Sequence, residues 1–288
     1  MLESVPNFSE GRDAGVVEKI ANAIAGTPGV ALLGYELDTD HNRSVITFAG
    51  DNSAVIEGAV RGVVEAAKLI QIPEHHGVHP RVGAADVVPF IPMEGATMAD
   101  AVAAAHQAGA MIWERARVPV YFYGEAAQRD TRRRLEKVRR KGFDGFPQDV
   151  GDVPVHPTAG ASVVGARPFL LAYNFDLTTP DVTIAQKIAV KIRESSGGFP
   201  YVKAIGLYLD SRKRAQVSMN LTDFTKIPLE DLYHQIASLA REMGTSVADG
   251  EVIGFVPRAA YQQDPAFFAR ASNFNESRIL ETRLSQLL

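Results

Sequence analysis

The sequence has no cysteine, so disulfide bonds and thiolate chemistry are excluded, which fits a reducing compartment. It has no apolar run long enough to cross a bilayer, and its N-terminus, MLESVPNFSEG, lacks the basic segment and apolar core of a secretory signal. It also lacks an excess of basic residues, because 30 Lys and Arg against 34 Asp and Glu give a net charge of −4. We therefore expect a cytoplasmic protein with no membrane or nucleic-acid partner, in which local basic residues hold any anionic ligand.

The hydrophobic pattern predicts an α+β protein whose two halves each read β-α-β-β-α-β, with an extra helix and strand in the first half. This order is that of ferredoxin-like units, and it predicts two subdomains, 1–167 and 168–288, with a ligand cleft or tunnel between them. The predicted strands are 2–6, 30–37, 44–50, 84–91, 118–124, 168–177, 203–210, 215–223 and 251–257. The segment 142–167 is rich in glycine and proline, and we expect either a linker or a functional loop without regular structure.

The segment HHGVHPRVGAADVVPFIP (75–92) places three histidines and an arginine immediately before an apolar strand. Gly77 and Pro80 disfavour a helix, which indicates a rigid loop. A metal site would need histidines on one intact helix face, so we expect no metal. The alternatives are a structural histidine and one acid–base histidine, for which His79 is the best candidate because Pro80 restricts its backbone.

Two further polar segments have both a functional and an ordinary interpretation. The first is DTDHNR (38–43), which contains His41 and follows Glu36. Its acidic side chains and Glu36 could orient a cation or a substrate amine. Asn42 and Arg43 could equally be ordinary turn residues. The basic segment TRRRLEKVRRKGF (131–143) is typical of a solvated surface helix, and the alternative is a rim that attracts an anionic ligand such as a polyglutamate tail. No stretch matches a phosphate loop or a dinucleotide fingerprint.

Several long motifs resemble the formiminotransferase module of the formiminotransferase-cyclodeaminase family, and the likeness covers nearly the whole chain. These motifs are VPNFSEGRD (5–13), HPRVGAADVVPFIP (79–92), VPVYFYGEAA (118–127), VGARPFLLAYNFDL (164–177) and GLYLDSRKRAQVSMNLTDF (206–224). The resemblance implies two ferredoxin-like subdomains with a tunnel between them and a homodimer. It also implies transfer of a formimino group from N-formimino-L-glutamate to N5 of the co-substrate tetrahydrofolate, in histidine degradation. The chain ends after the transferase module, so cyclodeaminase activity is not expected.

The resemblance also assigns residues. It implies that His79 is the catalytic histidine and that Arg81 beside it is catalytic and holds a substrate carboxylate. The family's acidic residue after its second strand maps onto Glu36 or Asp38, and we assign substrate binding to both together with Asn42 and Arg43. The folate-contacting loop maps onto Gly151, Asp152, Val153, Pro154, Val155, His156, Pro157, Thr158, Ala159 and Gly160. In this loop, Asp152, Val153 and His156 stand where the animal proteins have other residues.

The implied chemistry suits these side chains. The folate N5 amine would attack the amidine carbon, and one imidazole could take the N5 proton and return it to the departing glutamate nitrogen. A glutamate formyltransferase that uses the same site, and a non-catalytic folate-binding protein, are the alternative functions.

Overall fold

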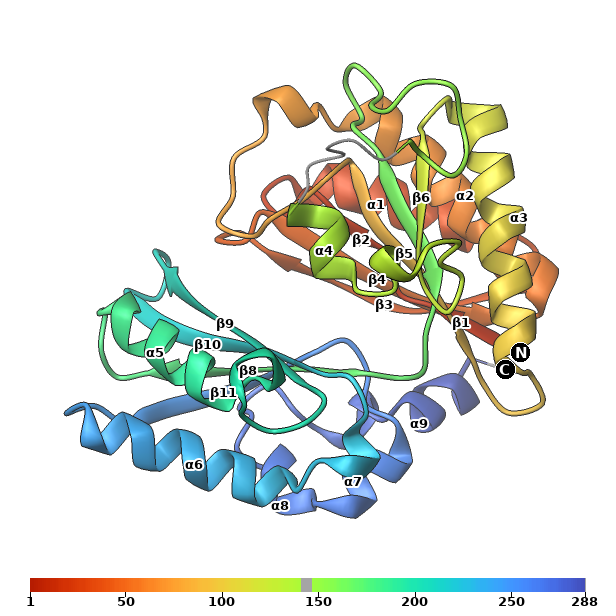
Figure 1. The fold of residues 1–288 in the computed structure, drawn as a ribbon. Coiled ribbons are helices and arrows are strands. Elements are labelled where there is room, and N and C mark those ends of the chain that lie inside the picture. Colours follow the sequence, from red (N-terminus) through yellow and green to blue (C-terminus); the bar gives the residue numbers. More distant parts are fainter. Residues whose placement is uncertain (141–146, 288) are drawn as a thin grey trace. The chain divides into compact units, whose positions relative to one another are not determined.

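The computed structural model describes residues 1–140 and 147–287 (Figure 1). The chain forms two compact units, Met1–Pro168 and Phe169–Leu288, and each contains a β-sheet with helices packed on it. The predicted α+β class is therefore confirmed. Among the described residues, no helix combines the length and the hydropathy that a membrane span requires.

The N-terminal unit contains a seven-stranded sheet. Strands β1 and β2 lie between β4 and β5, β3 pairs with the other edge of β4, and β7 lies between β5 and β6. The pairs β5–β7 and β7–β6 are parallel and the remaining pairs are antiparallel. Pro6 separates β1 from β2, because proline has no N–H to donate to a ladder. The strands are β1 (Leu2–Ser4), β2 (Asn7–Phe8), β3 (Val30–Asp38), β4 (Arg43–Gly50), β5 (Ala85–Pro92), β6 (Val120–Gly124) and β7 (Ser162–Ala166).

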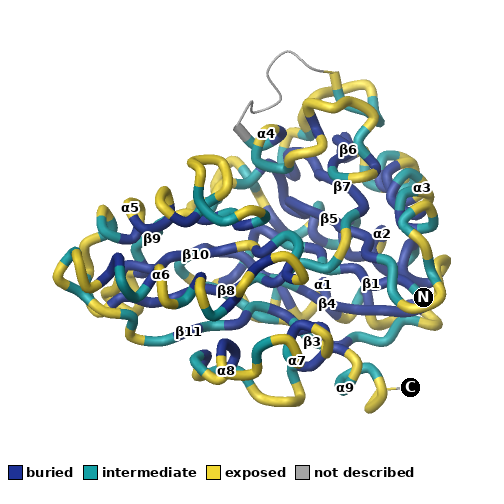
Figure 2. The backbone as a smooth tube through the Cα atoms, turned by 60° about the horizontal axis from the view of Figure 1, so that its bottom comes forward, coloured by how far each residue is buried: buried dark blue, intermediate teal, exposed yellow. Residues whose placement is uncertain are grey.

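Three helices pack their apolar faces on this sheet: α1 (Ala14–Ala25), α2 (Asn52–Leu69) and α3 (Met98–Ala116). The Asp13 side chain caps α1 by accepting from the N–H groups of Gly15 and Val16. Thr97 and Asp100 form a capping box at the start of α3. The strands and the inner helix faces form one continuous buried core (Figure 2).

Strand β7 corrects the prediction that 142–167 has no regular structure. All five of its residues are buried, although the segment before it is rich in glycine and proline. The signal for a strand is short, and Gly165 weakens it. The structure needs this glycine, because a Cβ there would collide with Tyr123 of the neighbouring β6. Residues 142–146 of this segment, and residues 141–143 of the basic segment 131–143, lie outside the described residues.

The short helix α4 (Leu135–Arg140) corrects the interpretation of the basic segment as a solvated helix. Leu135 and Val138 pack against a small apolar cluster that includes Tyr121 and Tyr123 of β6. Arg132, just before the helix, is buried, pairs with Asp149 and lies over the Tyr121 ring. Long basic side chains can cover apolar surface and still satisfy their charges, and the composition of the segment did not reveal this.

The C-terminal unit contains a four-stranded antiparallel sheet in the order β11-β8-β10-β9. Its elements follow the β-α-β-β-α-β order predicted for the second half. They are β8 (Leu171–Leu177), α5 (Val182–Ile192), β9 (Val202–Leu209), β10 (Arg214–Leu221), α6 (Leu229–Glu242) and β11 (Val247–Ile253), followed by α7 (Arg258–Gln263), α8 (Pro265–Phe268) and α9 (Leu280–Ser285). Tyr173, Phe175 and Leu177 lie in the helix-covered core, and Asn174 and Asp176 alternate with them on the other face.

Candidate active site

The loop that carries His79 is fixed at both ends by backbone hydrogen bonds. At its start, Ile72 N–H donates to Thr158 O (2.8 Å), and at its end Ala84 N–H donates to Ala159 O (2.8 Å). Ser9 donates its N–H to Ala84 O (2.8 Å), and its hydroxyl donates to Gly83 O (2.8 Å). The structure therefore brings the histidine loop, the PNFSEG motif and part of the predicted folate loop together in one place.

Arg81 holds the middle of this loop. Its Nη2 donates to His41 O (3.0 Å) and His79 O (2.9 Å), and its Nε also donates to His79 O (3.3 Å). Its Nη1 donates to Asn42 O (3.3 Å) and contacts the His75 ring. A guanidinium has five N–H donors, and these contacts use all five. The Arg81 guanidinium therefore joins the 38–43 turn to the histidine loop.

Asn42 and Gly77 make this close approach possible. Asn42 has a left-handed backbone (φ 46°), and its side chain accepts from Gly11 N–H (3.0 Å) and donates to His76 O (2.9 Å). A Cβ on Gly77 would collide with His41 O and with the Arg81 guanidinium. The predicted substrate-binding residue Asn42 is thus part of the scaffold that fixes the loop.

The hydrogen bond of His79 defines which ring nitrogen can act as a base. Its Nδ1 lies 2.8 Å from Pro80 O, and since a carbonyl oxygen only accepts, Nδ1 must carry the proton. Nε2 of the neutral ring is then an acceptor. Burial, followed by the positive charges of Arg43 and Arg139, holds the pKa of His79 well below its usual range, and Asp86 only partly offsets this. His79 is therefore neutral at pH 7.

A buried ionic cluster lies behind His79. Asp86 of β5 is fully buried, and its Oδ2 accepts from Arg43 Nη1 (2.6 Å) and from Arg139 Nη2 (2.6 Å). Its Oδ1 accepts from Val82 N–H (2.7 Å). Burial raises the pKa of Asp86, but Arg139 and Arg43 outweigh it, so the pKa lies below its usual range. Burial lowers the pKa of Arg43 to about 10.

This cluster contains two guanidinium groups and one carboxylate, so it leaves a positive charge beside His79. Arg43, predicted to bind substrate, is held by Asp86 and also donates its Nε to Asn7 Oδ1 (3.0 Å). Asp86 and Arg139 were not among the predicted site residues. A signal for Asp86 was available, because a carboxylate within the apolar strand AADVVPFIP needs a buried partner.

The acidic residues of β3 occupy one face of that strand. Glu36 and Asp38 are two residues apart and therefore point to the same side, and both are partly exposed. Asp38 Oδ1 accepts from His41 N–H (2.8 Å), and its Oδ2 lies 3.1 Å from His41 Nδ1. The His41 ring in turn lies 5.8 Å from the His79 ring, centroid to centroid. The sequence placed His41 in a polar turn without assigning it a role.

The predicted folate loop, 151–160, divides into two parts. Residues 152–155 are exposed, including Val153 (39%) and Val155 (43%), and Pro154 O accepts from the Tyr121 hydroxyl (3.0 Å). Residues 156–160 form a tight turn in which His156 Nδ1 accepts from two backbone N–H groups, those of Thr158 (3.2 Å) and Ala159 (3.0 Å). The second part anchors the loop, and the first part presents apolar surface.

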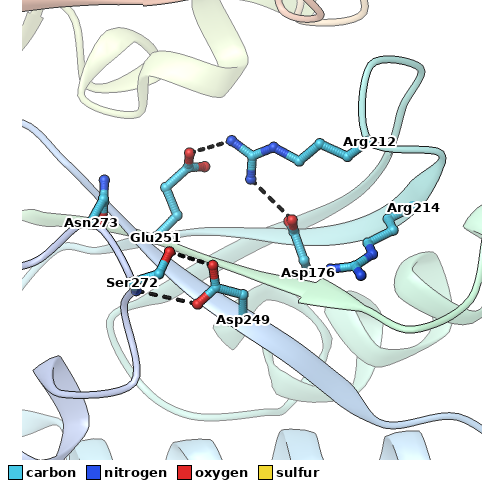
Figure 3. Close-up of a pocket in the computed structure, with 7 residues that line it drawn as sticks. All are labelled: Asp176, Arg212, Arg214, Asp249, Glu251, Ser272 and Asn273. Carbon is cyan, nitrogen blue, oxygen red and sulfur yellow. Dashed lines mark hydrogen bonds and ion pairs between the residues drawn. The ribbon is translucent and has the colours of Figure 1, made fainter.

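The C-terminal unit has a separate polar pocket with a volume of about 430 Å³ (Figure 3). Arg212 bridges Asp176 (3.0 Å) and Glu251 (2.5 Å), and the Ser272 hydroxyl donates to Asp249 (2.5 Å). None of the predicted site residues lines it. The complete lining is Asp176, Arg212, Arg214, Asp249, Glu251, Ser272 and Asn273. Across the described ranges, 1–140 and 147–287, no group of three or more His, Asp or Glu side chains is arranged to hold a metal ion.

Comparison with known proteins defines the family. The model described as "Formiminotransferase domain, N-terminal subdomain" matches residues 1–167, and that described as "Formiminotransferase domain" matches residues 172–285. The chain belongs to the formiminotransferase family, which confirms the resemblance seen in its motifs.

Three relatives show how far this similarity extends. The chain is 39% identical to a glutamate formimidoyltransferase of Thermoplasma acidophilum, over 99% of this chain and 98% of that protein. It is 40% identical to a glutamate formimidoyltransferase of Streptococcus pyogenes serotype M1, with the same coverage. A formimidoyltransferase-cyclodeaminase of Sus scrofa is 38% identical over 95% of this chain, and the match covers 53% of that longer protein.

Proposed function

We propose that the protein is a glutamate formimidoyltransferase, which transfers the formimino group of N-formimino-L-glutamate to N5 of tetrahydrofolate. Two relatives of this name match over almost their full length. The observation that carries the proposal is the state of His79, a neutral imidazole whose Nδ1 faces a carbonyl oxygen and whose Nε2 can accept a proton. The base that the reaction needs is thus available at pH 7.

In the proposed reaction, the lone pair of folate N5 attacks the amidine carbon and forms a tetrahedral intermediate. N5 becomes positively charged in this step, and His79 Nε2 takes its proton. A positioned general base contributes about 10²–10⁴ in rate. No covalent bond to the protein is needed. The carbonyl of Pro80 fixes the tautomer and orientation of His79, which this role requires.

The charges beside His79 suit the substrates, both of which are anionic. Arg43 and Arg139 share a single carboxylate, that of Asp86, so the cluster attracts negative charge. The five donors of Arg81 are used within the protein, so we assign it the positioning of His79 in place of the carboxylate contact that the family resemblance implied. A substrate carboxylate would then be attracted by the excess charge of the buried cluster.

The exposed part of the predicted folate loop, 152–155, would contact the aromatic portion of the folate. Val153 and Val155 present apolar surface, and burying it against an aromatic ring is favourable. Glu36 and Asp38 remain predicted substrate-binding residues on the same face of β3. The ligand cleft between the subdomains, the homodimer, the cytoplasmic location, the role in histidine degradation and the absence of a metal requirement also remain predictions.

The test is to mix the purified protein with tetrahydrofolate and either N-formimino-L-glutamate or N-formyl-L-glutamate, and to follow the N5-substituted folate. We expect turnover with the formimino donor, and we expect His79→Gln to reduce kcat by about 10²–10⁴. The matched control is His76→Gln, which changes an exposed histidine of the same loop.

Turnover with the formyl donor alone would identify the protein as a formyltransferase instead. Folate binding without turnover of either donor would make it a binding protein. Wild-type activity in His79→Gln would refute the role of His79.

A further inference from the structure

His41 has a different environment from His79, although the two rings are neighbours. The Asp38 carboxylate contacts His41 through both oxygens. Its Oδ1 accepts from the His41 backbone N–H (2.8 Å), and its Oδ2 lies 3.1 Å from the ring Nδ1. The ring is buried, lies 5.8 Å from the His79 ring and is tilted by 49° to it. His79 instead has a carbonyl at its Nδ1 and the guanidinium groups of the buried cluster nearby. One imidazole therefore faces a negative charge, and the other faces positive charges.

We propose that His41 is a second catalytic residue, the general acid that protonates the departing glutamate nitrogen. This inference rests on the proposed function and replaces a single shuttling histidine with a pair. An Asp–His pair of this kind orients the imidazole and stabilises a proton on it. Neighbouring titratable groups whose environments differ in this way commonly divide the acid and base roles between them.

Formimino transfer with two imidazoles would proceed in three steps. Folate N5 forms a bond to the amidinium carbon, the C=N π electrons move to the terminal nitrogen, and His79 Nε2 takes the proton from N5. The bond between this carbon and the glutamate nitrogen then breaks, and its electron pair stays on that nitrogen, which takes a proton from protonated His41. The terminal nitrogen re-forms the C=N bond. The products are 5-formiminotetrahydrofolate and glutamate, with His79 protonated and His41 neutral.

The spacing of the rings accounts for the return of the proton. One turnover leaves a proton on His79, beside Arg43 and Arg139, where a positive charge is unfavourable. The Asp38 carboxylate makes His41 the better place for that charge. With the ring centroids 5.8 Å apart, one bridging water could carry the proton between the two imidazoles. Transfer from His79 to His41 therefore restores both groups for the next turnover.

Two substitutions of His41 test this role. His41→Gln keeps an N–H near Asp38 and most of the volume, and we expect it to fold, to bind both substrates with wild-type Kd and to lose about 10²–10⁴ in kcat. His41→Ala should lose as much, and added imidazole should restore part of its activity. Pyrazole, which has nearly the same shape but is a much weaker base, should not. His76→Ala is the matched control.

Asp38→Asn should lower kcat by on the order of tenfold or more, because the imidazole loses its charged partner. A kcat within about threefold of wild type in His41→Gln would overturn the proposal. So would equal rescue by imidazole and pyrazole, which would indicate that His41 only fills space. Failure of the wild-type protein to transfer a formimino group would refute the proposed function itself, so the two failures are distinguishable.

Discussion

The substitution Asp86→Asn tests the buried ionic cluster. Asparagine has nearly the same shape but no charge, and its amide N–H donors would face either the two guanidinium groups or the Val82 N–H, depending on the orientation of the amide. Asp86 now accepts from Arg43 and Arg139, at 2.6 Å each, and from Val82 N–H at 2.7 Å. The change therefore leaves two buried or nearly buried cations without their shared counter-ion.

Removing one partner of a buried ion pair costs about 3–5 kcal/mol, because the remaining charge is uncompensated. The fully buried position of Asp86 places this substitution in that range. At a slope of about 2–3 kcal/mol per molar urea, the midpoint of unfolding should fall by about 1–2.5 M at pH 7. Adding Arg139→Met to Asp86→Asn should recover part of the lost stability, because it removes one of the two uncompensated guanidinium charges.

The assay is urea unfolding followed by tryptophan fluorescence. Trp113 is the single tryptophan of the chain and lies in α3, so the signal reports on the N-terminal unit. Glu94→Gln makes the same carboxylate-to-amide change at an exposed position, and it should leave the free energy of unfolding within about 0.5 kcal/mol of wild type.

The effect of Asp86→Asn should also depend on pH. The pKa of Asp86 is lower in the folded protein than its usual value near 3.8, so its stabilising contribution is complete above that value and is lost as the pH falls below it. The difference between wild type and variant should therefore shrink in acid. A cost below about 1 kcal/mol at pH 7, or a cost that stays constant down to pH 3, would refute this account of the cluster.

Three further predictions concern the site. Because burial and nearby positive charges hold the pKa of His79 well below its usual range near 6.5, kcat/KM should stay constant as the pH falls from about 7.5 to 6.5 and should decline only in more acidic solution. A decline centred at 6.5 would contradict this effect of burial and charge on His79. Replacing both Val153 and Val155 by serine should raise the KM for tetrahydrofolate by about 5–30-fold, since each presents about 40% of its surface, whereas Val190→Ser on α5 (42% exposed) should not. Arg81→Lys keeps the charge but not the five-donor fork, so kcat should fall by about 10–100-fold with little change in the KM for the formimino donor; near-wild-type kcat would show that charge alone matters.

The fold was predictable where local chemistry agrees with the final structure. The hydrophobic pattern predicts the order of strands and helices in the C-terminal unit, and alternating or continuous apolar runs predict most strands of both units. Strand β7 was not predictable in this way, because its five residues become a strand only by insertion between β5 and β6. Its neighbours in space are far away in the sequence, and propensity does not contain that information.

The candidate site was predictable to a similar degree. Gly77 and Pro80 around the histidines indicate a rigid loop, and the structure contains a loop held at both ends by backbone hydrogen bonds. The role of His79 as the base stays a prediction. The contacts of Arg81 could not be predicted, because four of its five donors meet backbone carbonyls, and a carbonyl has no sequence signature. The proximity of His41 to His79 could not be predicted for a related reason, since only the fold of the 38–43 turn brings the two rings together.

These contacts also explain what the family motifs encode. In PNFSEG, Asn7 holds Arg43 and Ser9 holds the end of the histidine loop, while the glycine of that motif donates its N–H to Asn42. None of these contacts requires a ligand, so much of the similarity to the family describes the frame around His79. The choice between a formimino and a formyl group must then depend on the few groups that face the transferred unit. His41 is not one of these in the role proposed above, because the glutamate nitrogen that it protonates is present in both donors. His41→Gln should therefore lower transfer from either donor that the wild-type protein uses, and a loss confined to the formimino donor would contradict the general-acid role of His41.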